Sequence, residues 1–329
     1  MSRARRYAAW PGLLLLLAVP AVSDDVPPSA APPPAPPAPE AISLLGKPLV
    51  PAEPAPERRR LLEDNLARAR GDFEAQPRSA DAAIWLGRRL AYLGRYRDAI
   101  AVYTRAITVH PREPRLLRHR GHRFITLRRF DDAIADLGRA AALIRSRADE
   151  VEPDGEPNAL NIPTSTLHFN IWYHLGLAHY LKGDFTKALD AYRRCMDVSR
   201  GSDDRLVAAT DWTYMTLRRL GRQAEAGALL APIHRDLKVI EDHAYHRRLL
   251  MYKGEVSPDG LLAGNADPTD IATQGYGVGN WHLYNGRADE ARAAFDRVVT
   301  GSQWAAFGFI AAEAELAREW RRGGDSNPR

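Results

Sequence analysis

The chain has 329 residues, of which 45% are hydrophobic and 26% charged, so it is long enough to bury a sizeable core. Its formal net charge is +5, but Arg3, Arg5 and Arg6 lie in the first 23 residues, which carry no acidic side chain, so the remainder is close to neutral at +2. Nucleic-acid binding needs a strongly basic surface, and we expect no nucleic-acid partner. The single cysteine, Cys195, cannot form an internal disulfide and is expected to be a small buried side chain.

Residues 1–23 have the organisation of a secretory signal peptide. Three arginines precede an apolar stretch of eleven residues, 12–22, and small residues lead up to Ser23. Eleven apolar residues are too few to cross a membrane, which takes about 20. We therefore predict cleavage near Ser23 and a periplasmic or secreted mature chain without a membrane span. The alternative is a chain anchored to the membrane by an uncleaved N-terminal helix that starts at Tyr7.

Residues 24–56 form a proline-rich linker. Twelve prolines lie between Pro27 and Pro56, and eight of them fall between Pro27 and Pro39. Such a segment buries little apolar surface and favours extended polyproline II conformations. We expect it to be disordered and to separate the signal from the folded part.

The next 260 or so residues repeat one spacing. The first copy has Gly87, Gly94, Tyr96, Ala99, Tyr103, Ala106 and Pro111; the second has Gly121, Phe130, Ala133, Leu137 and Ala140; the third has Gly176, Gly183, Phe185, Ala188, Tyr192 and Cys195. A period of 34 residues with small residues at fixed places predicts stacked helical hairpins. The pattern resembles the tetratricopeptide repeat (TPR) family. The resemblance implies an all-α fold, a right-handed α-solenoid of hairpins closed by a C-terminal capping helix.

The repeat spacing divides residues 57–322 into hairpins. The expected repeats are 80–113, 114–147, 169–202 and 207–240, then a degenerate repeat at 241–264, a repeat at 272–301, a capping helix at 303–320 and a disordered tail at 323–329. Repeat two has Arg128 where repeat one has Gly94, which weakens its turn because glycine takes a positive φ more readily.

An acidic insertion, residues 148–168, interrupts the period between repeats two and three. It carries Asp149, Glu150, Glu152, Asp154 and Glu156. Insertions in repeat proteins map to loops and often carry function. A solvated loop without a role is the alternative.

A search for chemistry finds no catalytic constellation. His243 and His246, like His119 and His122, stand three residues apart on predicted helices, but a zinc site needs three or four converging ligands. We predict no cofactor, no metal and no enzymatic activity. A metal-dependent hydrolase or another enzyme that uses His243 and His246, or the acidic residues 149–156, is the alternative.

In tetratricopeptide repeats, the first helix of each hairpin lines a groove that holds a peptide. Carried over by position, the resemblance implies a groove lined by Arg88, Arg115, Arg118, His122, Tyr173, Leu177, Tyr180, Tyr276 and Asn280. Arginines suit carboxylates and tyrosines suit amphipathic contacts, so we expect a protein or peptide partner with an acidic segment, and a scaffold function in the bacterial envelope. Two alternatives stay open: the arginines are ordinary solvated surface, or the acidic insertion folds back onto Arg88, Arg115 and Arg118.

Overall fold

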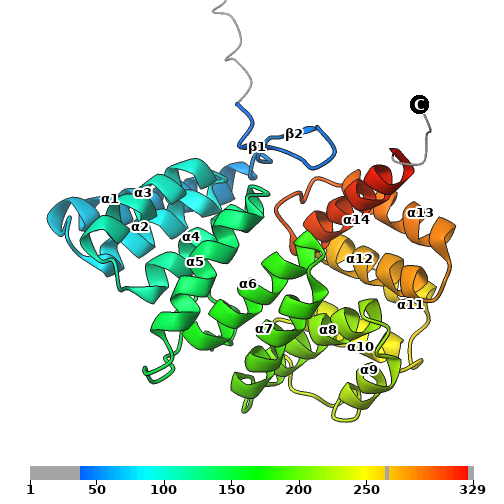
Figure 1. Cartoon of the computed structure of the whole chain (residues 1–329). Coiled ribbons are helices and arrows are strands. Elements are labelled where there is room, and N and C mark those ends of the chain that lie inside the picture. Colours follow the sequence, from blue (N-terminus) through cyan, green and yellow to red (C-terminus); the bar gives the residue numbers. More distant parts are fainter. Residues whose placement is uncertain (1–37, 264–266, 325–329) are drawn as a thin grey trace, which may run out of the picture. The chain divides into compact units, whose positions relative to one another are not determined.

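The structure is a computed structural model that describes residues 38–263 and 267–324. The predicted signal peptide, the first part of the linker and residues 325–329 of the predicted tail lie outside the described residues. Within them the chain forms two short strands and fourteen helices, which follow one another from blue to red in Figure 1. The all-α fold class is confirmed.

The elements, in chain order, are β1 (Ala41–Ile42), β2 (Pro48–Leu49), α1 (Pro56–Ala75), α2 (Ala80–Tyr92), α3 (Tyr96–Val109), α4 (Pro114–Thr126), α5 (Phe130–Leu143), α6 (Leu167–Lys182), α7 (Phe185–Val198), α8 (Asp203–Arg219), α9 (Gln223–Leu229), α10 (His243–Tyr252), α11 (Pro258–Leu262), α12 (Pro268–Tyr284), α13 (Ala288–Val299) and α14 (Phe307–Gly324).

Side-chain caps fix where the first helix of each hairpin begins. Ser79 accepts a hydrogen bond from the backbone N–H of Ala82 at the start of α2, and Thr166 accepts one from Phe169 at the start of α6. Glu113 and Ser202 do the same for α4 and α8. Each cap satisfies a backbone donor that the helix itself leaves free. The caps therefore set the residue at which α2, α4, α6 and α8 each begin.

Glycines at the predicted small positions let the two helices of a hairpin come close together. A Cβ added to Gly87 of α2 would lie 2.3 Å from Tyr103 Cε1 of α3, and one on Gly176 of α6 would lie 2.6 Å from Tyr192 Cε1 of α7. Gly121 has the same relation to Leu137, and Gly279 to Phe295. The aromatic and leucine side chains therefore fill the space that a side chain on the glycine would take. The packing predicted from the repeat spacing is confirmed at these positions.

The second helix of each hairpin packs on the first helix of the next, as α3 does on α4, α5 on α6 and α7 on α8, and the first helices also contact one another. Helix α4 contacts both α2 and α6, and α8 contacts α6. Contacts also form between helices far apart in the sequence, because α12 packs on α8 and α14 packs on α6 as well as on α12 and α13 (Figure 1). Helix α10 packs on both α8 and α12. The face that the first helices share is therefore covered by other helices of the same chain in its later part.

Part of the linker departs from the expected disorder. Strands β1 and β2 pair antiparallel, with Ala41 opposite Leu49, and both of these side chains are buried. The indole Nε1 of Trp304 donates a 2.7 Å hydrogen bond to the backbone oxygen of Val50. The prolines concentrate before residue 40, whereas residues 40–50 contribute apolar side chains, so this stretch buries enough surface to become ordered. A two-stranded sheet also tolerates Pro48, because both strands are edges.

Candidate protein-binding site

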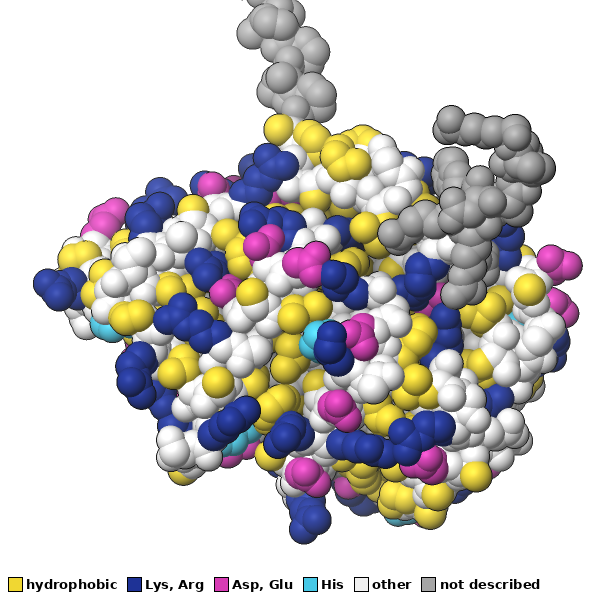
Figure 2. Space-filling view, viewed as in Figure 1, with side chains coloured by type: hydrophobic (Ala, Val, Ile, Leu, Met, Phe, Trp, Pro, Cys, Tyr) yellow, Lys and Arg dark blue, Asp and Glu magenta, His cyan; other side chains and the backbone are white. Residues whose placement is uncertain are grey.

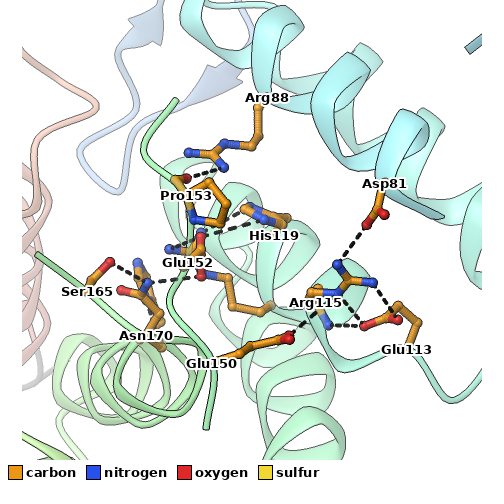
Figure 3. A network of polar contacts seen from close by, with 12 residues as sticks. Asp81, Arg88, Glu113, Arg115, His119, Glu150, Glu152, Pro153, Ser165 and Asn170 are labelled. Atoms are coloured by element: carbon orange, nitrogen blue, oxygen red, sulfur yellow. Dashed lines mark hydrogen bonds and ion pairs between the residues drawn. The ribbon is translucent and has the colours of Figure 1, made fainter. Parts of the chain in front are cut away.

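Arginines from two neighbouring helices face the acidic insertion. Helix α2 contributes Arg88 and Arg89, and α4 contributes Arg115 and Arg118, which share a helix face because they stand three residues apart. We call these four residues the cationic patch. Figure 3 shows residues 150–153 of the insertion lying between Arg88 and Arg115 on one side and Asn170 of α6 on the other. Arg88 and Arg115, both predicted to line the groove, remain half-buried, whereas Arg118 is buried.

The carboxylate of Glu152 is the most deeply placed acidic group of the insertion. Its Oε1 lies 3.0 Å from Arg118 Nη2, and both side chains are at most 10% exposed. Its Oε2 accepts a 3.0 Å hydrogen bond from Asn170 Nδ2 of α6. A buried carboxylate is stable only when paired and hydrogen-bonded in this way. Glu152 thus joins the insertion to both α4 and α6 (Figure 3).

The ring of His119 lies beside this ion pair in its neutral form. Arg118 Nη1 lies 3.1 Å from His119 Nδ1, and because a guanidinium only donates, Nδ1 accepts. Nε2 of the same ring is 3.6 Å from Glu152 Oε1. Burial, followed by the nearby charge of Arg118, lowers the pKa of His119 well below its usual value. Arg118 is therefore the cation that neutralises Glu152 at pH 7.

Arg115 forms a second, more exposed group of ion pairs. It contacts Asp81 Oδ1 at 2.7 Å, Glu113 Oε1 at 2.9 Å and Glu150 Oε1 at 3.8 Å. Glu113 is a stronger partner than Glu150, because it accepts from both the side chain and the backbone N–H of Arg115. Each exposed pair contributes about 0–1 kcal/mol. Glu150 is therefore held much less firmly than Glu152.

The backbone of the insertion also contacts the cationic patch. Arg88 Nη1 donates a 2.7 Å hydrogen bond to the carbonyl of Pro153, and Arg89 Nη1 donates a 2.7 Å bond to the carbonyl of Gly155. Gly155 itself packs so tightly that an added Cβ would lie 1.8 Å from Tyr92 Oη. The alternative in which the insertion folds back onto Arg88, Arg115 and Arg118 is thus confirmed. Arg89, which sequence analysis did not single out, takes part as well; its only signal is its place next to Arg88.

Two small clefts adjoin this contact. One of about 350 Å³ is lined by residues that include Trp85, Arg88, Arg115 and Glu152. Another of about 140 Å³ is lined by residues that include Arg88, Arg118, Arg123 and Glu152. Arg88, His119 and Glu152 border both clefts, so the two clefts share part of their lining.

The remaining residues of the predicted groove do not line an open surface. Tyr173, Leu177, Tyr180, Tyr276 and Asn280 are all less than 10% exposed, and His122 is half-buried against the rings of His174 and Phe307. This corrects the expectation of an open aromatic groove, because α10, α12 and α14 cover that part of the first-helix face. Direct contact of these residues with a partner stays a prediction, and it requires that the covering helices move.

The covered tyrosines bond to one another instead. Trp212 Nε1 donates to Tyr173 Oη at 2.8 Å, and that oxygen lies 2.9 Å from Tyr245 Oη of α10. Tyr276 Oη and Asn280 Nδ2 both donate to Tyr180 Oη, at 2.8 and 2.9 Å. Their hydroxyl groups are satisfied within the chain, which is the usual requirement for buried polar groups. The same residue types that predicted a binding surface here hold distant repeats together.

The structure adds no observation in favour of the enzyme alternative. His246 Nε2 lies 2.9 Å from the carbonyl of His234, while His243 is exposed. Across residues 38–263 and 267–324, no group of three or more His, Cys, Asp or Glu side chains is placed to hold a metal ion. The described helices also include none that is both long and apolar enough to cross a membrane. Cys195 is buried, and burial raises the pKa of its thiol well above the usual value.

On the face viewed in Figure 2, Lys and Arg side chains are spread over the surface with Asp and Glu side chains between them. This mixture agrees with the small net charge outside the first 23 residues.

Comparisons with known proteins place the repeats. Residues 86–151 and 169–201 match two family models, both described as tetratricopeptide repeat. No curated protein matches the chain.

Three crystal structures illustrate the similarity among solved proteins. A tetratricopeptide repeat protein from Parabacteroides merdae is 15% identical over 77% of this chain and 92% of its own, with a TM-score of 0.44. MamA is 16% identical over 62% of this chain and 99% of its own, with a TM-score of 0.41. YrrB, described as a TPR protein with an unusual peptide-binding site, is 15% identical over 77% of this chain and 97% of its own, with a TM-score of 0.39.

Proposed function

We propose that this chain, whose residues 86–151 and 169–201 match tetratricopeptide repeat models, is a scaffold for protein–protein interaction. It holds an acidic peptide of a partner protein on the cationic patch, in the bacterial envelope. The observation that carries the proposal is the seating of Glu152 between Arg118, His119 and Asn170. The patch thereby has the geometry to take a carboxylate on an extended chain. No observation favours a second function.

Two features make the patch a better candidate than the rest of the first-helix face. Arg88, Arg89 and Arg115 are half-buried, so a partner reaches them without unfolding the core. Their guanidinium groups offer paired donors that suit carboxylates and backbone carbonyls. Tyr173 and Tyr180 of repeat three, in contrast, are already bonded to Tyr245 and Tyr276 of later helices.

Site-specific photo-crosslinking in cells of the native organism tests the scaffold role. A photoreactive amino acid at Trp85, which lines the 350 Å³ cleft, should crosslink to a defined partner protein. The matched control carries the same amino acid at Lys187 on α7, whose side chain is 67% exposed. Identical products from both positions, or none from Trp85, would contradict the proposal.

The envelope location rests on the sequence of residues 1–23 alone and has its own test. Fractionation and N-terminal sequencing should find the chain in the periplasm or the medium, beginning at Asp24. A membrane-bound chain that keeps its first residues would instead support the uncleaved anchor. A full-length chain in the cytoplasmic fraction would exclude both.

A further inference from the structure

We propose that residues 150–155, here called the acidic segment, are an internal ligand of the cationic patch. They occupy the place that an acidic, extended peptide of the partner protein takes. The partner binds by displacing them. This inference rests on the proposed function and adds to it the regulation of the site and the pattern of the partner's segment.

The acidic segment is held like a bound peptide in extended form. The backbone N–H of Glu152 donates to the carbonyl of Ser165, and the N–H of Leu167 donates to the carbonyl of Glu150, around an antiparallel bridge between Val151 and Thr166. Alternate side chains of an extended chain share a face. Glu150 and Glu152 accordingly both meet arginines of α4, while Val151 between them is 60% exposed.

The contacts define what a competing segment must carry. Two carboxylates two residues apart meet Arg115 and Arg118, and the backbone carbonyls of Pro153 and Gly155 meet Arg88 and Arg89. Glycine is favoured at the Gly155 position, because a Cβ there would lie 1.8 Å from Tyr92 Oη and would push that side chain aside. The expected partner segment thus has the pattern acidic, any, acidic, any, any, glycine.

The acidic segment is fastened in a way that permits exchange. Only Glu152 makes a buried ion pair, since Glu150 is 3.8 Å from Arg115 and Arg58 pairs with Glu156 at the exposed surface. Oδ2 of Asp154 is buried without a hydrogen-bond partner, which disfavours the arrangement in which the acidic segment lies on the cationic patch. Burial also raises the pKa of the Asp154 carboxyl. The acidic segment is therefore an imperfect ligand for its own site.

Displacement would also release unmatched positive charge. Arg88, Arg118 and Arg123 all border the 140 Å³ cleft, and Glu152 is its one acidic lining residue. Among the described residues, Arg88 and Arg123 have no carboxylate within ion-pair distance; Arg123 lies over the ring of Tyr96. Because Glu152 borders both clefts, its withdrawal would enlarge both of them. A partner with an additional carboxylate can pair there, which the acidic segment does not.

An internal ligand competes with any partner at high effective concentration. The apparent affinity for the partner is the intrinsic affinity multiplied by the fraction of time that the site is open.

The test uses the purified mature chain and a fluorescein-labelled peptide of residues 148–157, with a second peptide that has Gln at positions 150 and 152. Variant Gly155→Val cannot seat its own segment, and Glu152→Gln weakens it by loss of charge. Gly71→Val on α1, where a Cβ would meet no atom within 4 Å, is the matched control.

Fluorescence anisotropy should show the acidic peptide binding Gly155→Val and Glu152→Gln at least tenfold more tightly than the wild type and Gly71→Val. The Gln peptide should bind none of them. Circular dichroism and thermal unfolding verify that each variant is folded. Equal affinity for wild type and both loop variants would overturn the internal ligand while leaving an acidic-peptide site in place. Absence of binding to all four proteins would overturn the acidic site as well.

Hydrogen exchange adds a readout for displacement itself. Saturating peptide should speed exchange at the backbone amides of Glu152 and Leu167 in the wild type, because both are bonded across the insertion. Protection that persists while the peptide is bound would place the peptide elsewhere and contradict the proposal.

Discussion

The guanidinium of Arg128 and the carboxylate of Glu313 lie 2.6 Å apart, with side chains 3% and 0% exposed. They join the turn between α4 and α5 to helix α14, which lies 185 residues further along the chain. Arg128 Nη2 also donates to the carbonyl of Trp304, and the backbone N–H of Leu44 donates to Glu313. One buried ion pair thus connects the second helical hairpin, the capping helix α14 and the hairpin formed by β1 and β2.

Arg128 reaches this position at a conformational cost. Its φ is +63°, a value that the equivalent turn residue Gly94 adopts without strain. The sequence shows this departure but not its reason, which is the carboxylate at the other end of the chain. Glu313→Gln should lower the free energy of unfolding by about 3–5 kcal/mol, because it leaves Arg128 buried without its counter-charge. Urea unfolding followed by circular dichroism measures the change.

The matched variants sharpen that prediction. Arg128→Gly also breaks the pair but removes about 1–2 kcal/mol of backbone strain, so it should cost less than Glu313→Gln. Arg129→Ala, next in the chain, removes an exposed pair with Asp132 and should cost no more than about 1 kcal/mol. An equal decrease in the free energy of unfolding for Glu313→Gln and Arg129→Ala would show that the buried pair stabilises the fold no more than an exposed pair does.

Glycine-to-alanine changes at two helical positions should have opposite signs. Gly87→Ala places a methyl group 2.3 Å from the ring of Tyr103, and such overpacking costs about 1–3 kcal/mol. Gly138→Ala on α5 meets no atom within 4 Å and should stabilise by about 0.5–1 kcal/mol through helix propensity. Thermal unfolding of the two variants tests the role of the repeated small position. A Gly87→Ala protein that unfolds at the wild-type temperature would contradict that role.

Three histidines should make the fold sensitive to acid. Burial lowers the pKa of His119, His122 and His174 well below the usual value, and the charges of Arg118 and Arg123 add to this effect. The unfolded chain binds protons near pH 6.5 and the folded chain does not, so stability is lost as pH falls below about 6.5. Each histidine contributes up to about 1.4 kcal/mol per pH unit in that range.

The measurement compares the free energy of unfolding of wild type and His122→Gln at pH 7.5, 6.5 and 5.5. The variant should lose less stability than the wild type between pH 6.5 and 5.5. Parallel curves would mean that His122 takes up a proton equally well in both states.

Asp242 should give a dependence of opposite sign. Burial, followed by the carboxylates of Asp204, Glu241 and Asp211, raises its pKa to about 8. Between about pH 4 and pH 8 the folded chain keeps a proton that the unfolded chain has released, so stability falls as pH rises. Asp242→Asn carries no charge, and its advantage over the wild type should grow from pH 5 to pH 8 and then level off. A difference independent of pH would contradict the raised pKa.

How far the sequence could predict the fold depends on whether a contact is local. The pairing of Gly87 with Tyr103 and of Gly176 with Tyr192 repeats with the period, and the helical hairpins followed from it. The contact of α14 with α6 occurs once, so the repeat period of the sequence does not predict it. Tyr173 and Tyr180 were therefore expected on an open groove, although Tyr245 and Tyr276 from later helices bond to them.

The candidate site was more accessible to prediction, because charge complementarity is visible in composition. A run of acids next to repeats rich in arginine suggests the fold-back of the insertion onto Arg88, Arg115 and Arg118, but only as one of two alternatives to binding of a partner. Which carboxylate becomes buried depends on register, and the bridge of Val151 with Thr166 sets it. The order of residues 40–50 was missed because the neighbouring prolines dominate the composition of that segment.

The β-hairpin near the N-terminus has a consequence for how the chain reaches its final form. An ordinary solenoid contacts only adjacent repeats and can assemble progressively from whichever end appears first. Here Val50 bonds to Trp304 and Leu44 to Glu313, so β1 and β2, whose neighbour Glu40 already bonds to Arg97 of α3, complete their contacts only after α1–α13 have been made. Such contacts between segments far apart in the sequence delay the last folding step. A ribosome-bound fragment ending before Trp304 would leave the β-hairpin in contact with α3 but without Trp304 and Glu313.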